Sequence, residues 1–223
     1  MPEDGTEGRE AVHFPTLPPL PDGDYRTIMA DPPWAYDDTL PGGGRGAESH
    51  YDVLDEHMIA GMGPQVRAVT DQVAHLYLWT TNSFLSQAHE IAGAWGFEPK
   101  TVFTWVKAAD APETLPHERD EPATARREFP LGHYARNTTE HIVFATKGNL
   151  GTNADDAVTH FLASTGEHSS KPEKSYRLAE YLSDGPRLEL FSRRERPGWD
   201  TWGDEAEEPA AAVATDGGER DEE

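Results

Sequence analysis

The chain has 223 residues and a formal net charge of −22, because 41 aspartate and glutamate residues outnumber 19 lysine and arginine residues. This length is enough for one domain of ordinary size with a buried core. The chain contains no cysteine, which excludes disulfide bonds, thiolate metal sites and a cysteine nucleophile. The acidity taken alone argues against a polyanionic partner, since electrostatic attraction dominates much of nucleic-acid affinity.

The negative charge is spread along the chain. Residues 1–10 carry a net charge of −3 and residues 205–223 one of −7, which leaves −12 for the residues between them. We interpret this acidity as adaptation to a high-salt cytosol, where the Debye length shrinks to about 3 Å near 1 M and self-repulsion is screened. No apolar run reaches the roughly 18 residues of a membrane span. The N-terminus is acidic, unlike a signal peptide, so we expect a cytoplasmic protein without membrane contact.

The predicted elements alternate between strands and helices. Short runs rich in β-branched and aromatic residues predict strands at 25–30, 73–80, 100–107, 141–147 and 187–192. Helices are expected at 55–69, at 82–95 with Asn82 as its cap, and at 170–183 with Ser170 as its cap. This order predicts an α/β fold with a mostly parallel sheet and helices on both faces. In such folds ligands bind beyond the carboxyl ends of the strands.

Three segments show little regular periodicity. Residues 1–24 read as a flexible acidic and proline-rich arm, and residues 206–223 as a disordered acidic tail, so the folded domain is expected at 25–205. Residues 108–136 form a long irregular segment within that domain. A loop of this length in a compact domain is usually functional or mobile.

The tetrapeptide Asp31-Pro32-Pro33-Trp34 follows the first predicted strand, at the expected ligand edge. The prolines stiffen the turn and leave their carbonyls as free acceptors, while the tryptophan offers a flat surface. This set suits a planar ligand with an amino group, such as adenine. Acceptance of both amino hydrogens, at the Asp31 carboxylate and the Pro32 carbonyl, directs the nitrogen lone pair toward an electrophilic methyl group. The alternative is a rigid turn with a core tryptophan.

Four segments together resemble the MT-A70 family of N6-adenine methyltransferases. They are ADPPWAY near residue 31, HYARNTTEHIVFATKG at 133–148, HSSKPEKSY at 168–176 and RLELFSRRERPGWDTWGDE at 187–205. They occur in the family's order and cover residues 25–205. The resemblance implies a Rossmann-like methyltransferase fold in a single domain, with S-adenosylmethionine as the cofactor.

The resemblance also implies roles at the substrate end of the site. Asp31 would be catalytic, accepting from the target amine beside the cofactor, with Pro32 and Pro33 completing the turn. Trp34 would stack on the target adenine, which must leave a duplex first. Tyr51 falls where the family places an aromatic residue in a substrate loop. That loop is rich in glycine, as a mobile lid would be, although a solvated loop is the alternative.

Cofactor roles follow in the same way. Lys171 matches the family lysine beside the cofactor, and Arg193 matches an arginine that contacts the adenosyl part. Asp204 and Glu205 match the polar pair that binds the ribose hydroxyls, although many relatives have asparagine at the first of these positions. Glu189 is a weaker candidate, because it lies on a predicted strand and could face solvent.

Basic residues are scarce, so those near the predicted cleft are candidates for phosphate or substrate contacts. They are Lys107, Arg126, Arg127 and Arg136. The alternative for the three arginines is solvated charge paired with nearby acids. The histidines lack HExxH spacing or a cysteine partner, so no metal site is expected.

The sequence thus predicts an S-adenosylmethionine-dependent N6-adenine methyltransferase acting on nucleic acid, with DNA favoured over RNA. Two alternatives are kept. One is an RNA adenosine methyltransferase, and the other is a catalytically silent binding subunit of the same family. Either a homodimer or a heterodimer is compatible with the sequence.

Overall fold

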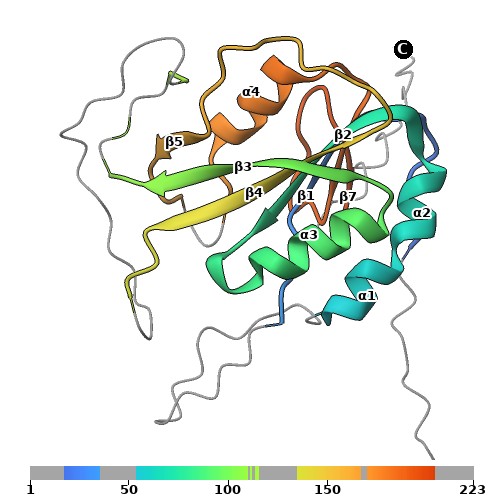
Figure 1. The fold of residues 1–223 in the computed structure, drawn as a ribbon, viewed down its shortest axis with the longest axis horizontal. Helices are drawn as coiled ribbons and strands as arrows, with labels where there is room; N and C mark the ends of the chain where they lie inside the picture. Colours follow the sequence, from blue (N-terminus) through green and yellow to red (C-terminus); the bar gives the residue numbers. More distant parts are fainter. Residues whose placement is uncertain are drawn as a thin grey trace, which may run out of the picture.

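The computed structural model describes residues 18–35, 54–109, 111, 114–115, 135–166 and 170–203. Within these ranges one sheet is flanked by helices (Figure 1). The strands are β1 (Tyr25–Ala30), β2 (Thr70–Thr80), β3 (Glu98–Lys107), β4 (Thr139–Lys147), β5 (His160–Ala163), β6 (Arg187–Leu190) and β7 (Asp200–Trp202). The helices are α1 (Glu56–Gly61), α2 (Gly63–Ala68), the 3₁₀ turn η1 (Asn82–Phe84), α3 (Leu85–Ala94) and α4 (Glu173–Leu182).

The sheet has the strand order β5-β3-β4-β2-β1-β6-β7. Every neighbouring pair is parallel except the two that include β4, which runs antiparallel to both β2 and β3. The predicted α/β fold with a mostly parallel sheet is therefore confirmed. The reversal has a consequence for function, because the first residues of β4 lie at the same edge as the last residues of its neighbours.

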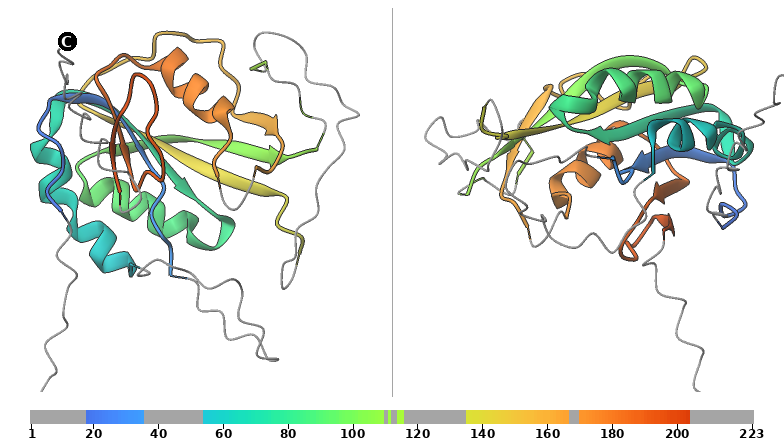
Figure 2. Two further views of the ribbon diagram at one scale, coloured as in Figure 1. Left: turned by 180° about the vertical axis from the view of Figure 1, so that it is seen from behind. Right: turned by 90° about the horizontal axis from the view of Figure 1, so that it is seen from below.

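Helices cover both faces of the sheet, as predicted. Figure 2 (right) shows α4 on one side of the sheet, and α1, α2 and α3 on the other. The central strand β2 is buried from both sides, so its side chains alternate between two apolar clusters. Leu76 and Leu78 join the cluster with α1 to α3, whereas Tyr77 and Trp79 join the cluster with α4.

All three helix predictions differ from the structure in detail. The helix expected at 55–69 is divided at Met62 into α1 and α2, because Gly63 and Pro64 follow and proline has no N–H for the helix ladder. The caps expected at Asn82 and Ser170 are wrong. Asn82 lies inside η1, and α4 begins after Pro172, which has extended backbone angles and no side-chain cap.

The sequence also missed the strands at the two edges of the sheet. β5 has four residues and β7 has three, so neither is long enough to show a clear alternation of apolar and polar residues. Both pair in parallel with a longer or central neighbour, β5 with β3 and β7 with β6. Tertiary pairing, rather than local propensity, therefore defines them.

Packing of the chain begins before the first strand. Leu20, in the segment read as an arm, is buried in the apolar cluster beneath α1 to α3. The Pro18 carbonyl accepts a hydrogen bond from the Trp202 indole at 3.2 Å, which ties this segment to β7. Residues 1–17 and 206–223 lie outside the described residues. No helix in the described ranges is both long and apolar enough to span a membrane.

Candidate active site

The turn after β1 places Asp31 at the carboxyl edge of the sheet. Its backbone N–H donates to the Leu190 carbonyl at the end of β6, with a donor–acceptor distance of 3.4 Å. The proline carbonyls are not free, contrary to expectation. Pro32 accepts from the Trp34 N–H at 2.9 Å, and Pro33 accepts from the Leu54 N–H at 3.3 Å. Since a carbonyl oxygen has two lone pairs, each can still accept one further hydrogen bond.

Trp34 packs inside the domain. Its side chain is 7% exposed, and its ring stacks on Phe84 with centroids 5.1 Å apart. The indole N–H donates to the Trp79 carbonyl at 3.1 Å. This arrangement matches the core tryptophan that the sequence left open as an alternative. Stacking of Trp34 on a target base stays a prediction.

Four charged side chains of alternating sign form a chain across this edge. Lys171 Nζ lies 2.9 Å from Asp31 Oδ2 and 3.2 Å from Glu140 Oε2. Glu140 Oε1 lies 2.7 Å from Lys107 Nζ. The four side chains come from the ends of β1, β3 and β4 and from the segment before α4. We call this set, Asp31, Lys171, Glu140 and Lys107, the charged chain.

Burial and neighbouring charges oppose each other in the charged chain. Burial raises the pKa of Asp31, and the adjacent Lys171 ammonium only partly offsets that rise. Burial alone would lower the pKa of Lys171, but the charges of Asp31 and Glu140 together raise it. Burial alone would raise the pKa of Glu140, yet the two lysines lower it. Lys171 and Glu140 are thus held charged, whereas Asp31 is held closer to neutrality than an ordinary aspartate.

Two tryptophans lie beneath the lysines of the charged chain. Lys171 Nζ lies 5.3 Å from the Trp79 ring centroid, and Lys107 Nζ lies 5.1 Å from that of Trp105. The two rings meet edge to face with centroids 6.2 Å apart. An ammonium group is attracted to the negative face of such a ring, which supports both lysines in a partly dry site.

A second cluster lies beside Asp31, on β6 and α4. Glu189 is buried and accepts a hydrogen bond from the Tyr176 hydroxyl at 2.5 Å. Its other oxygen, Oε2, is buried and lies 3.8 Å from Arg196 Nε, beyond hydrogen-bond distance. Burial raises the pKa of Glu189, and the Tyr176 hydroxyl and the Arg196 charge offset that rise only in part. Glu189 therefore faces the interior near Asp31 and does not face solvent.

The structure brings together only some of the predicted site residues. Asp31, Lys171 and Lys107 meet in the charged chain. Arg193 is exposed just after β6, and its charge lowers the pKa of Asp31, so it acts on the same site. Arg136 is exposed before β4, outside the charged chain. The remaining predicted residues lie outside the described ranges; they are Tyr51, Arg126, Arg127, Asp204 and Glu205.

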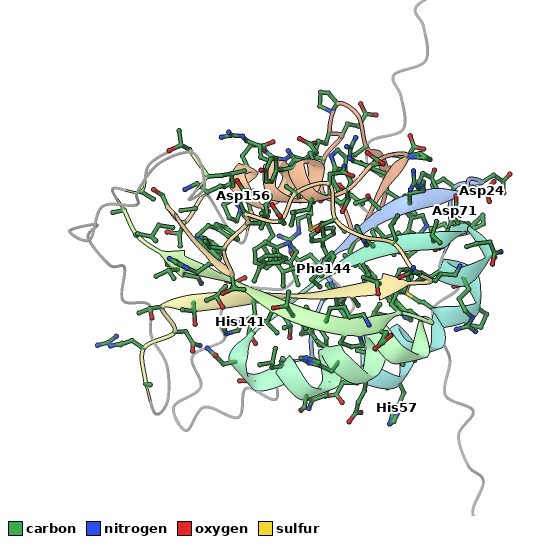
Figure 3. All side chains as sticks on the ribbon, turned by 45° about the horizontal axis from the view of Figure 1, so that its top comes forward. Asp24, His57, Asp71, His141, Phe144 and Asp156 are labelled. Atoms are coloured by element: carbon green, nitrogen blue, oxygen red, sulfur yellow. The ribbon has the colours of Figure 1, made fainter. Side chains whose placement is uncertain are left out.

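Sequence reasoning missed Glu140, which joins the two lysines. It lies near the amino end of its strand, next to His141, which Figure 3 marks where β4 begins. A parallel strand would place that end away from the ligand edge. Only the reversal of β4 brings Glu140 to Asp31. The signal was the polar pair Glu140 and His141 directly before an apolar run within a recognised motif.

Fold and site together define an α/β domain of the Rossmann-like methyltransferase type, with an acidic residue after the first strand at the ligand edge. A model of the MT-A70 family matches residues 25–205. The chain belongs to the MT-A70 family, which confirms the predicted resemblance.

Several described proteins are similar to this chain. The type II methyltransferase M.MunI of a Mycoplasma species is 27% identical over 224 residues, which cover 90% of this chain and 86% of M.MunI. The human N(6)-adenosine-methyltransferase catalytic subunit METTL3 is 28% identical over 187 residues, or 82% of this chain and 28% of that protein. A Drosophila melanogaster MT-A70-like N(6)-adenosine-methyltransferase is 27% identical over 191 residues, which cover 82% of this chain and 27% of that protein. The chain thus spans most of M.MunI but under a third of the other two.

Proposed function

We propose that this chain transfers a methyl group from S-adenosylmethionine to the N6 amine of adenine in nucleic acid. The observation that carries the proposal is the placement of Asp31. Its carboxylate stands at the ligand edge, 2.9 Å from the Lys171 ammonium, in the motif by which the chain resembles the MT-A70 family. Two of the relatives named above, human METTL3 and the Drosophila melanogaster protein, are adenosine N6-methyltransferases by name.

The acceptors after β1 suit an amino group as the nucleophile. An adenine amine is weakly nucleophilic because its lone pair is delocalised into the ring. Asp31 would accept one amino hydrogen, and the remaining lone pair of the Pro32 carbonyl would accept the other. Two fixed acceptors favour a pyramidal nitrogen and stabilise the positive charge that develops on it. Asp31, as the nearest carboxylate, would hold the proton that the nitrogen loses.

The residues present fit the cofactor, which supplies an electrophilic methyl group on a sulfonium centre when it is bound. This ligand carries positive charge on sulfur and on its amino group, and negative charge on its carboxylate. Lys171 and Arg193 would hold the negative part. The carboxylate of Asp31 offers an acceptor to the positive parts, and the buried Glu189, which also faces Arg196, adds a second negative group nearby.

We favour DNA over RNA as the polymer. The support is the extent of the match to M.MunI, which covers 86% of that protein, against 28% of METTL3. "Type II" designates modification methyltransferases, whose substrate is DNA. Contacts to phosphates would come from Arg136 and from arginines outside the described ranges, Arg126 and Arg127.

The test is a competition between the two polymers. Purified chain, isotopically labelled S-adenosylmethionine and equal amounts of mixed-sequence DNA and RNA are incubated, and the nucleosides are analysed by mass spectrometry. We expect N6-methyladenine with the label, predominantly in DNA. Label in RNA alone would refute the choice of polymer, and no labelled adenine in either polymer would refute the proposed activity. Asp31→Ala, as the matched variant, should give no labelled product.

We also propose that the protein works at high salt. The support is the net charge of −22 and the use of arginine for 14 of 19 basic residues. Screening should stabilise so acidic a chain, so the melting temperature should rise between about 0.1 M and about 3 M KCl. A melting temperature that falls over this range in thermal denaturation would contradict adaptation to salt.

A further inference from the structure

The loop between β6 and β7, residues 191–199, lies against α4. The loop connects two parallel strands, and its residues Arg196 and Trp199 contact α4. The loop carries Arg193, and α4 begins two residues after Lys171. The two basic positions proposed to hold the cofactor are therefore on separate elements, and their spacing depends on how those elements are joined.

One stripe of α4 makes the junction. Glu173, Tyr176 and Glu180 are spaced three and four residues apart, so they share one face of the helix. Arg196 contacts the first two, and the Trp199 indole N–H donates to Glu180 at 2.8 Å. The Trp199 ring also meets Tyr176 edge to face, with centroids 5.7 Å apart. The loop is thus fixed at three points along the helix.

Arg196 makes the most specific of these contacts. Its Nη1 donates to both carboxylate oxygens of Glu173, each at 2.5 Å. Its guanidinium carbon lies 3.3 Å from the Tyr176 ring centroid, and its Nε lies 3.8 Å from Glu189 Oε2. Only a planar guanidinium can pair with one carboxylate, stack on a ring and face a second carboxylate together. The side chain is 8% exposed, so this geometry is held inside the domain.

We propose that Arg196 is a positioning residue for the cofactor. Through Glu173 and Tyr176 it fixes the distance between Lys171 on the helix side and Arg193 on the loop side. The contact with Glu173 lies two residues from Lys171, and Arg196 lies three residues from Arg193, so little chain separates the junction from either position. This inference rests on the proposed function, since it assigns the residue to S-adenosylmethionine binding.

A purely structural role makes a different prediction. Replacing a residue that only stabilises the fold lowers the melting temperature and weakens the binding of every ligand to the same extent. Replacing a residue that sets the spacing of two cofactor contacts weakens cofactor binding and leaves the affinity for nucleic acid unchanged. The ratio of the two dissociation constants therefore distinguishes the two roles.

The experiment measures both dissociation constants in two variants of the full chain. Arg196→Lys keeps the charge but loses the planar fork, and Glu173→Gln removes the charge of a half-exposed partner with little risk to folding. In both we expect about a tenfold or larger rise in the Kd of S-adenosylmethionine by calorimetry, with the Kd of DNA within about twofold of wild type. The double variant should bind the cofactor no more weakly than the weaker single variant, because both act through one contact.

Asp156→Asn is the matched control. It alters the hydrogen bond that the exposed Tyr181 of α4 donates to Asp156, and it should leave both dissociation constants unchanged. Wild-type cofactor affinity in Arg196→Lys and Glu173→Gln would overturn the positioning role, and so would equal weakening of cofactor and DNA. A wild-type chain that binds no S-adenosylmethionine would instead overturn the proposed function on which this role rests.

Discussion

Replacement of Glu140 by glutamine tests the charged chain directly. Glu140 lies between two ammonium groups, at 2.7 Å from Lys107 Nζ and 3.2 Å from Lys171 Nζ, and its side chain is 17% exposed. Each pair has a gross attraction of about 5 kcal/mol at an effective dielectric constant of about 20. Much of this is offset by desolvation, and glutamine keeps one oxygen acceptor. The expected net loss of stability is about 2–3 kcal/mol.

The measurement is urea denaturation and thermal melting at neutral pH. A loss of this size lowers the melting temperature by about 5–10 °C in a chain of this length. Methyl transfer should also fall, because Lys171, already 2.9 Å from Asp31 Oδ2, would then pair with Asp31 alone and compete more strongly for its acceptor oxygens. Glu98→Gln is the control. Glu98 pairs with Lys100 at 2.6 Å, but the side chains are 76% and 42% exposed, so the change should cost about 0.5 kcal/mol or less.

The stabilisation by Glu140 depends on pH. Burial would raise the pKa of Glu140, but Lys171 and Lys107 lower it below its ordinary 4.5 in the folded chain. A carboxyl with a depressed folded pKa stabilises above its unfolded pKa, and this stability is lost as pH falls through the folded pKa. The stability gap between wild type and Glu140→Gln should thus be full near neutral pH and close below about pH 4.5. An equally stable variant at neutral pH, or a gap that stays constant into acid, would refute this account.

Two further substitutions test the packing around the site. Trp34→Phe removes the donor to the Trp79 carbonyl and part of the stack on Phe84. It should lower the free energy of unfolding, measured by urea denaturation, by about 1–3 kcal/mol. An unchanged free energy of unfolding would show that the indole is not packed as described. Gly63→Ala would place a Cβ 2.6 Å from the Ala94 carbonyl oxygen and should cost about 1–3 kcal/mol in thermal melting. Gly93→Ala, which has open space, is its control and should be neutral or slightly stabilising, and equal effects would contradict the close approach.

The central strands and the position of Asp31 could be predicted from the sequence because their signals are local. The predicted strand at 25–30 coincides with β1, and Asp31 follows it directly. The apolar run at 73–80 lies within β2, which is buried on both faces and needs no alternation. Strands of this kind form because their apolar side chains are buried on both faces, and the apolar composition of the run is enough to predict them.

The features that could not be predicted depend on tertiary pairing. The direction of β4 follows from its hydrogen bonds to β2 and β3 and leaves no trace in its own residues. Glu140 was missed for that reason. The stack of Trp34 on Phe84 could not be predicted either, because the two residues lie fifty positions apart in the chain; stacking of Trp34 on a target base stays a prediction. The prediction of Ser170 as a helix cap was wrong because α4 begins directly after Pro172.

The most direct test of the account is the single-turnover rate of methyl transfer in Asp31→Asn at saturating S-adenosylmethionine and DNA. Asparagine has nearly the same shape but lacks the charge that stabilises the developing positive charge on the amine. We expect the rate to fall by about 1000-fold or more, which corresponds to about 4 kcal/mol of transition-state stabilisation. A rate within about tenfold of wild type would show that the Asp31 carboxylate does not carry the reaction.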